Sequence, residues 1–359
     1  MINFNQDVFS VASAIFEKHD QQTRYHDVEP WPEDLWTQLQ ATGFTSIGRD
    51  GALEDHAALA KAVGIFAVAL PLVDVGLARW TADHAGLEIA DEIVVVCAGL
   101  NAKDRIEGRT DEGGRVSLTG TAHRVPWARN ADLLIVPVEI DGVMRWAKIG
   151  PAGLEFREGV NFASEPRDDV RFDGLLIDAD VIGAPGPRLK DVQARGALMR
   201  GASAVGAMEF VLDASLTFAE HRVQFGRSIS AFQTVQHHLV LIAEATAAVS
   251  SAVDAAVFAG PEQRLMMVAA AKVMLGEQAA ILTRLAHQVH GAIGATEEHP
   301  LQPRTRRLWS WQDEFGTTTD WAAELGEQLV FPGSPGAWQA MTPPLDELAD
   351  RDVSETVPW

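Results

Sequence analysis

The sequence has little cysteine and little positive charge, and both shortages exclude classes of protein. Cys97 is the single cysteine, so no disulfide can form within the chain, which fits a reducing compartment such as the cytoplasm. Only 29 lysines and arginines stand against 50 aspartates and glutamates, which gives a net charge of −21. A field of that sign repels the phosphate backbone of nucleic acids, so nucleic-acid binding is not expected.

The sequence also lacks a recognisable signal for export or for a membrane. Residues 1–10 show no basic stretch followed by an apolar run, as a signal peptide would. The most apolar windows, such as Ala57–Val75, contain charges and Pro71 and are too interrupted to cross a bilayer. We therefore expect a cytoplasmic protein that does not enter a membrane.

With 359 residues, of which 47% are hydrophobic, the chain can bury a large core and form two or three domains. We predict a helical domain over residues 1–90, a β-domain over 91–185, a helical bundle over 186–331 and a tail over 332–359, which is rich in proline, glycine and acids. The N-terminal helices are expected over Val8–Glu17, Trp31–Leu39, Leu53–Val68 and a segment from Pro71 to Ala85.

Six short runs of β-forming residues predict a compact antiparallel barrel or sandwich in the middle of the chain. Turn sequences such as Asp141-Gly142 and Asp173-Gly174 separate these runs. The expected strands are Ile93–Ala98, Val116–Leu118, Leu133–Val138, Met144–Lys148, Val170–Phe172 and Leu175–Ile177.

Apolar residues at helical spacing then predict a four-helix bundle. A di-iron centre in such a bundle would need Glu-x-x-His pairs, and these helices have none. No Gly-x-Gly-x-x-Gly sequence opens a helix after a strand, so a Rossmann site is not expected either. His287 and His290 could bind a metal, but without partner carboxylates we assign them a structural role. The expected helices are Asp191–Phe218, Ala231–Val257, Glu262–His290 and Trp321–Leu329.

The segment Arg222–Gln236, between the first two of these helices, carries the strongest chemical signal. The guanidinium of Arg222 can donate two parallel hydrogen bonds to a pyrophosphate. Phe225 can offer an aromatic face to an adenine, because Gly226 lets the backbone fold close behind it. An ordinary corner between two helices, with a packed phenylalanine, explains these residues equally well.

Two longer motifs favour the first interpretation. Residues 222–236 (RVQFGRSISAFQTVQ) resemble the R-x-Q-F-G-x-x-I-x-x-F-Q-x-x-Q signature of the acyl-CoA dehydrogenase family, and residues 288–300 (QVHGAIGATEEHP) resemble its Q-x-x-G-G-x-G-x-x-x-E-x-P segment. A weaker match, Gly120-Thr121 with Ala131-Asp132, lies where that family has G-T-K and A-D in its β-domain. The resemblance covers essentially the whole chain. It implies an α+β fold with a helical N-terminal domain, a small antiparallel β-domain and a C-terminal four-helix bundle.

The resemblance also implies an oligomeric, FAD-dependent oxidoreductase that removes hydrogen from an acyl-CoA thioester and passes electrons to a partner protein. Arg222 and Phe225 would hold the nucleotide end of FAD across a subunit interface. The full set of residues that the resemblance assigns to FAD is Arg222, Phe225, Phe232, Gln233, Gln288, Gly291 and Thr317. The second glycine of the family's Gly-Gly pair is Ala292 here.

The family's reaction needs a carboxylate base, because the α-proton beside a thioester is weakly acidic. That base usually lies in a Y-E-G-T segment, which reads Glu314-Phe315-Gly316-Thr317 here, so Phe315 stands at the position of the carboxylate. The alternative base position of the family falls at about Gly196. Glu314 is then the candidate base, with Asp313 beside it, although a shift of one residue turns a side chain away.

Other family segments are missing as well. Cys97–Ala102 and Arg124–Pro126 stand where the family has its T-E-P-x-x-G-S-D and W-I-T flavin segments. The chain thus resembles the base-lacking subunit of bacterial heterotetramers in steroid breakdown, and we predict one subunit type of a heteromeric acyl-CoA dehydrogenase in lipid or steroid catabolism. The alternative is a flavin-poor structural subunit that supports a catalytic relative. Two basic clusters could attract the anionic coenzyme A, namely Arg195 with Arg200, and Arg304 with Arg306 and Arg307.

Overall fold

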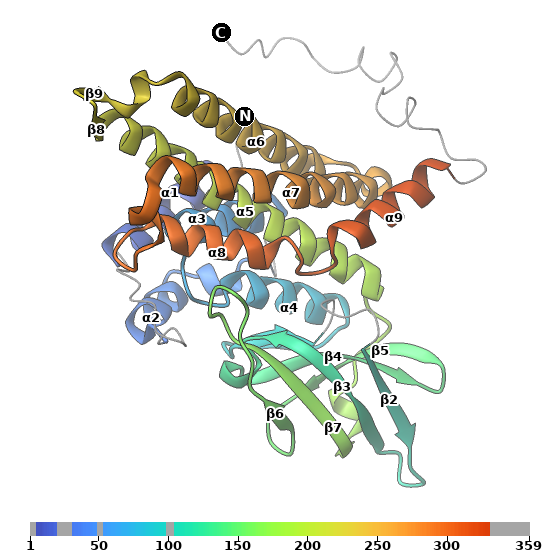
Figure 1. Cartoon of the computed structure of the whole chain (residues 1–359). Helices are drawn as coiled ribbons and strands as arrows, with labels where there is room; N and C mark the ends of the chain where they lie inside the picture. The colour runs from blue at the N-terminus through green and yellow to red at the C-terminus, as the bar shows by residue number, and fades with distance from the viewer. Residues whose placement is uncertain (1–4, 20–30, 49–52, 98–103, 331–359) are drawn as a thin grey trace.

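The computed structural model describes residues 5–19, 31–48, 53–97 and 104–330, and three parts follow one another along the chain (Figure 1). Short helices form the first part, a curled sheet the second, and long helices the third. The fold class predicted from the sequence is therefore confirmed. Residues 332–359, the expected tail, lie outside the described residues.

Four α-helices of the N-terminal part lie where the apolar spacing predicted them. Gly43 follows the second at φ 78°, a left-handed conformation that glycine adopts without strain. Pro71 precedes the fourth, where no intrahelical hydrogen bond from its nitrogen is needed. The helices are α1 (Gln6–Lys18), α2 (Glu33–Ala41), α3 (Leu53–Phe66) and α4 (Leu72–His84).

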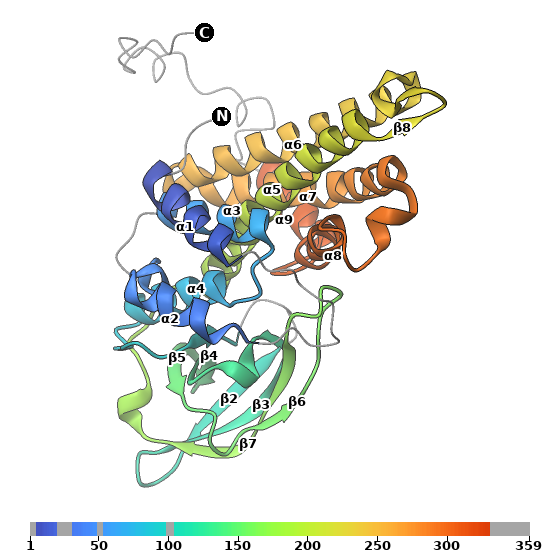
Figure 2. The same ribbon diagram turned by 90° about the vertical axis from the view of Figure 1, so that its left-hand side faces the viewer.

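A curled, seven-stranded sheet forms the middle part, in the order β1-β4-β2-β3-β7-β6 with β5 paired to β4. Most pairs are antiparallel, as predicted, but β1 and β2 run parallel to β4. In Figure 2 the sheet lies on one side of the helices, with α2 and α4 nearest to it. The strands are β1 (Val94–Val96), β2 (Arg105–Thr110), β3 (Val116–Pro126), β4 (Leu133–Ile140), β5 (Val143–Ile149), β6 (Glu155–Arg157) and β7 (Arg167–Ile177).

One predicted turn in this sheet is wrong. Asp173-Gly174 was expected to separate two strands, but both runs belong to β7. Leu118 pairs with Leu175 and Thr119 pairs with Asp173, so Gly174 is an extra residue in the ladder. Its φ of 72° suits such a bulge, because a glycine has no Cβ and adopts a positive φ without strain. The strands β2 and β6 were not predicted.

The C-terminal part contains the four predicted helices and a fifth, α8, which was not predicted. A small hairpin, β8 (Val223–Gln224) with β9 (Arg227–Ser228), joins the first two long helices and projects from one end of the bundle, while α9 lies at the other (Figure 1). The helices are α5 (Leu189–His221), α6 (Gln233–Phe258), α7 (Pro261–His290), α8 (Leu301–Trp311) and α9 (Thr318–Val330).

Three of these helices are long and apolar enough, by length and composition alone, to cross a membrane: α5, α6, and α7 with the turn that follows it. The expectation that no stretch of the chain meets this criterion is therefore not met. In the structure the three helices pack against one another, and part of the apolar window of each is buried between them.

The interior holds two hydrophobic cores and a set of buried charges, the charged layer. One core fills the space between the helices and reaches Val94, Ile135 and Trp146 of the sheet, and the other lies within the curl of the sheet. The charged layer lies where α4, the start of β7, α5 and α8 meet. Its residues are Asp74 from α4, Glu165 and Arg167 at the start of β7, Arg200 from α5, Arg307 from α8, and Glu314 after it.

Candidate functional site

The predicted nucleotide corner is an open, solvent-exposed hairpin. Arg222 ends α5, and Phe225 and Gly226 form the turn at φ 51° and φ 80°. The ring of Phe225 is 92% exposed and meets Phe232 edge-on, with ring centroids 6.1 Å apart. The guanidinium of Arg227 lies 4.2 Å from the Phe232 ring. Gln233, the first residue of α6, is exposed on the same corner. The corner therefore presents an aromatic face and guanidinium groups that the described part of the chain does not cover.

The glycine-rich segment lies at the same end of the bundle. Gln288 is exposed near the end of α7, and Gly291 follows that helix at φ 63° and ψ −148°, a conformation that is essentially restricted to glycine. Phe218, close to the corner on α5, stacks on His290 with centroids 4.6 Å apart. The stack joins the corner to the glycine-rich segment, so the residues expected to hold the nucleotide end of FAD are brought together, apart from Thr317.

The two positions at which the family carries its base, Phe315 and Gly196 in this chain, lie far from this corner and pack against each other. Phe315 is buried, and its ring packs against Gly196: a Cβ on Gly196 would lie 2.5 Å from Cε1 of the ring. Gly196 and Arg222 are separated by roughly 39 Å along α5, at 1.5 Å per residue. One flavin adenine dinucleotide cannot contact both places, so this chain can contribute its corner only to a flavin whose ring end is held by another subunit.

The Phe315–Gly196 contact gives a first prediction. Gly196→Ala should lower the free energy of unfolding by about 1–3 kcal/mol, because the new methyl group overlaps the ring. Phe315→Leu in the same chain should recover part of the loss by removing the overlapping atoms. Gly326→Ala is the matched control, since a Cβ there meets no atom within 4 Å. Chemical denaturation is measured for the native chain, the two single variants, the double variant and the control. Independent, additive effects of the two substitutions would contradict the contact.

Glu314, the candidate base, is instead part of the charged layer. It is 1% exposed and accepts hydrogen bonds from Nε of Arg167 at 2.8 Å and from Nε of Arg200 at 2.6 Å. Burial would raise the pKa of Glu314, but the charges of Arg167 and Arg200 outweigh it and lower the pKa to about 2. A carboxylate held this way is a poor proton acceptor at neutral pH. The environment of Glu314 therefore does not suit a base, and Asp313 beside it is exposed.

The charged layer continues on both sides of Glu314. Arg200 also donates from Nη2 to Asp74 at 2.7 Å, and Arg167 donates from Nη2 to Glu165 at 3.0 Å. Glu165 accepts a further bond from Nε of Arg307 at 3.1 Å. Three guanidinium groups and three carboxylates thus alternate across the junction of the three parts. Each buried charge has a partner of opposite sign, which is the condition for burying it.

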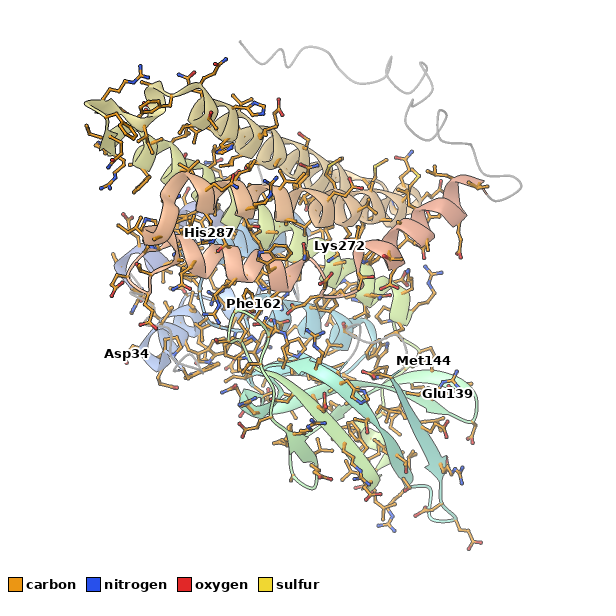
Figure 3. The ribbon with its side chains drawn as sticks, in the orientation of Figure 1. Asp34, Glu139, Met144, Phe162, Lys272 and His287 are labelled. Carbon is orange, nitrogen blue, oxygen red and sulfur yellow. The ribbon has the colours of Figure 1, made fainter. Side chains whose placement is uncertain are left out.

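The loop that carries Phe315 is held in place by a buried lysine. Nζ of Lys272, on α7, donates to the carbonyl oxygens of Trp311, Gln312 and Glu314 at 3.2, 2.7 and 2.9 Å. Figure 3 marks the position of Lys272 beside the end of α8. These bonds satisfy carbonyls that the end of α8 leaves unpaired. The lysine therefore fixes the direction in which the loop presents Phe315.

Thr317, the remaining residue assigned to FAD, caps α9. Its hydroxyl donates to the carboxylate of Asp320 at 2.8 Å, and its backbone N–H donates to the same carboxylate at 2.9 Å. Two stretches stand where the family has its β-domain flavin segments. The first falls mostly on residues 98–103, which lie outside the described residues. Directly after the second, Trp127 is buried against Trp31, with ring centroids 6.1 Å apart, and is a core residue.

The two basic clusters do not form a surface for coenzyme A. Arg304 donates to the carbonyl of Ile65 at 2.9 and 3.0 Å, and Arg306 donates to the carbonyl of Phe162 at 2.7 Å (Figure 3). Arg307 and Arg200 belong to the charged layer described above. These side chains join α8 to the N-terminal helices and to the loop before β7, so they stabilise the fold.

Sequence reasoning missed most of the charged layer, although a signal for it exists. Asp74, Arg200 and Lys272 each stand alone within a run of apolar or small residues on a helix: PLVDVGL, LMRGAS and AAAKVML. A charged residue with apolar neighbours on both sides is buried beside a partner of opposite charge, or else its helix does not enter the core. The pattern therefore marks buried charges, but it does not say which ones meet.

Only one of the two regions described above fits its part of FAD. The corner and the glycine-rich segment suit a nucleotide: they are exposed and offer a guanidinium, an aromatic face and a glycine that permits close approach. The region of Phe315 does not suit a flavin ring with an acyl group, since Phe315, Gly196 and the charged layer fill it. A flavin ring and a catalytic carboxylate would have to come from another subunit.

Comparisons with known proteins identify relatives of the C-terminal part and solved structures with the same fold. Residues 192–318 match the family model described as "Acyl-CoA dehydrogenase, C-terminal domain". The chain is 33% identical over 144 residues to a probable acyl-CoA dehydrogenase, fadE25, of Mycobacterium leprae, a stretch that covers 38% of this chain and 37% of that protein. It is 31% identical over 202 residues to a probable acyl-CoA dehydrogenase, YngJ, of Bacillus subtilis, covering 55% and 51%. The chain therefore spans about half or less of the length of these curated relatives.

Among solved structures, the ChsE4–ChsE5 complex from Mycobacterium tuberculosis superposes with a TM-score of 0.81 at 20% identity, over 92% of this chain and 98% of that one. A likeness at that identity shows the fold. Residues 192–318 therefore belong to the acyl-CoA dehydrogenase C-terminal domain family, and nearly the whole chain shares the fold of solved acyl-CoA dehydrogenases.

Proposed function

We propose that this chain is one subunit type of a heteromeric, FAD-dependent acyl-CoA dehydrogenase, and that it supplies the nucleotide side of a shared flavin site while the partner supplies the catalytic base. One observation carries the proposal: both base positions, Phe315 and Gly196, are packed against each other, while the nucleotide corner is open. When bound, FAD supplies the hydride acceptor of the family's reaction.

The roles of this chain's own residues follow from their exposure. Arg222 would pair with the pyrophosphate, and Phe225 would cover the adenine. Gly291, in the turn after α7, has no Cβ and would let backbone N–H groups of that turn come close to the phosphates. None of these three residues is a base, and Glu314 is held as a carboxylate by Arg167 and Arg200, so the partner would have to take the α-proton. One solved structure with this fold is the ChsE4–ChsE5 complex, which supports a heteromer here.

The proposal is tested by comparing the chain alone with a mixture. Purified alone and supplied with FAD, the chain should not oxidise any acyl-CoA of a panel, measured as reduction of an artificial electron acceptor. Co-expressed with a homologue that keeps a carboxylate at the position of Phe315, it should form a yellow complex that turns over. Turnover by the chain alone would refute the missing base. A colourless complex would refute the flavin role and leave a structural subunit, the alternative already considered.

A further inference from the structure

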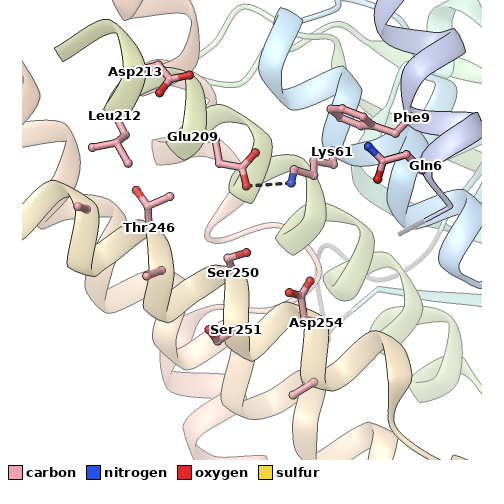
Figure 4. A pocket seen from close by; sticks show the side chains of 13 residues that line it. Gln6, Phe9, Lys61, Glu209, Leu212, Asp213, Thr246, Ser250, Ser251 and Asp254 are labelled. Atoms are coloured by element: carbon pink, nitrogen blue, oxygen red, sulfur yellow. Dashed lines mark ion pairs between the residues drawn. The ribbon is translucent and has the colours of Figure 1, made fainter. Parts of the chain in front are cut away.

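A cavity of about 750 Å³ opens between α1, α3, α5 and α6, and none of the residues assigned above to flavin or to the base lines it. Figure 4 shows Phe9 from α1 and Lys61 from α3 on one side, Leu212 from α5 above, and the side chains of α6 below. Its volume lies within the range of pockets that hold small organic ligands. The wall that α6 contributes consists mainly of small side chains, so the space is not filled from that side: Ala243, Ala247, Ser250, Ser251 and Ala255.

A buried hydroxyl group in this wall lacks a partner. Ser250 is 8% exposed and lines the cavity, and no hydrogen bond joins its side chain to another described residue. Thr246, one turn earlier on the same helix, instead donates to the carbonyl of Ile242 at 2.9 Å. The hydroxyl of Ser250 is therefore available to a ligand with a polar head in the cavity.

The charges around the cavity are unbalanced. Lys61 is the one cation among the lining residues, and it already pairs with Glu209 at 2.8 Å (Figure 4). Asp213 lines the cavity as well, so among the described lining residues the carboxylates of Glu209 and Asp213 outnumber the ammonium group of Lys61. Such a wall repels the phosphates of an acyl-CoA and the carboxylate of a fatty acid, and it attracts a cation. The ring of Phe9 and the side chain of Leu212 provide apolar surface between the charges.

We propose that this cavity binds an amphiphilic amine, with its apolar body against Phe9, Leu212 and the alanines of α6, and its ammonium group directed to Ser250 and Asp213. The ammonium donates hydrogen bonds, and the serine oxygen and the aspartate carboxylate accept them. The site does not depend on the proposed flavin role, since no residue of that role takes part.

Three probes with the same chain length separate the contributions of charge and apolar surface. Dodecylamine, dodecanol and dodecanoate should be titrated into the full chain by isothermal calorimetry below their aggregation concentrations. Dodecylamine should bind with saturation at one site, and dodecanoate at least about tenfold more weakly, a difference of about 1.4 kcal/mol. Equal binding of the amine and the carboxylate would overturn the proposal.

Two variants and a control locate the binding. Ala247→Leu fills the cavity from an exposed position on α6 and should abolish dodecylamine binding, and Asp213→Asn should reduce the preference for the amine over the alcohol. Glu244→Gln removes an exposed acid from α6 outside the cavity and should change nothing, which controls for general attraction to this acidic chain.

If Ala247→Leu leaves binding intact, the site is elsewhere. If it instead changes the oligomeric state by light scattering, the cavity is a subunit contact and the proposal fails.

Discussion

Arg222→Ala is expected to leave the assembled heteromer colourless. Arg222 ends α5 on the exposed corner, and the proposed site gives it the pyrophosphate of FAD as its partner. Removing one member of a charge-assisted pair in an interface costs about 2–5 kcal/mol, which weakens FAD binding by roughly 30-fold or more. At ordinary protein concentrations most of the flavin should then be lost during purification. The fold should not change, because the corner lies outside the core.

The measurement is the ratio of flavin absorbance to protein absorbance in the purified complex, with the oligomeric state followed by light scattering. Arg188→Ala is the matched control: Arg188 is also exposed and lies just before α5, at the opposite end of the bundle, paired with Asp191. That variant should keep its flavin. A second variant, Phe225→Ala, should weaken FAD by a smaller factor. Full flavin occupancy in Arg222→Ala would refute the assignment of the corner.

The elements of this fold could be predicted where one periodic signal dominates. The long helices α5, α6 and α7 have apolar stripes, and Gly260-Pro261 marks the break between the last two. The apolar stripe of α8 is short, Leu301, Leu308 and Trp311, and it is interrupted by Arg304 and Arg307, which lie on the same buried face and have partners far away in the sequence. Gly174 led to the opposite error, since a glycine with positive φ serves a bulge as well as a turn.

The candidate site, too, could be predicted from the sequence only in part. The corner could be predicted because all its residues lie within one short segment, where spacing alone fixes which side chains meet. The closure of the base positions could be predicted only in part: Phe315 and Gly196 were each found, but their contact depends on how α8 returns to the start of α5. The charged layer joins Asp74 to Glu314 through Arg200, across most of the chain, and no local pattern specifies such pairs.

The charged layer also explains why the altered site is stable without a ligand. A cavity between α4 and α5 would expose apolar side chains or leave polar groups unpaired. Here Arg200 reaches both Asp74 and Glu314, and Arg167 reaches Glu165, so the space contains paired charges. Such a layer fixes the three parts of the chain against one another. The proposed role, in which the chain presents its corner to a partner, would benefit from that rigidity, because the corner is then held in one orientation.

Glu314→Gln should therefore destabilise the fold strongly and should not act as a simple loss of a catalytic group. The amide keeps the shape of the carboxylate but leaves Arg167 and Arg200 buried with less negative charge, which costs about 3–5 kcal/mol. Asp191→Asn is the control, since it breaks an exposed pair with Arg188 and should cost at most about 1 kcal/mol. Urea denaturation of the purified chain gives both values. A loss in Glu314→Gln as small as in the control would refute the structural role.

The same interaction predicts a dependence on pH. The pKa of Glu314 lies at about 2 in the folded chain, below its ordinary value of 4.5, so the folded state binds fewer protons than the unfolded state between these values. The stabilisation is complete above about pH 4.5 and is lost as the pH falls towards 2. Asp74 acts in the opposite direction, because burial raises its pKa. The urea midpoint of the native chain should thus fall more steeply with acid than that of Glu314→Gln. Equal slopes would mean that Glu314 is not held as a carboxylate by Arg167 and Arg200.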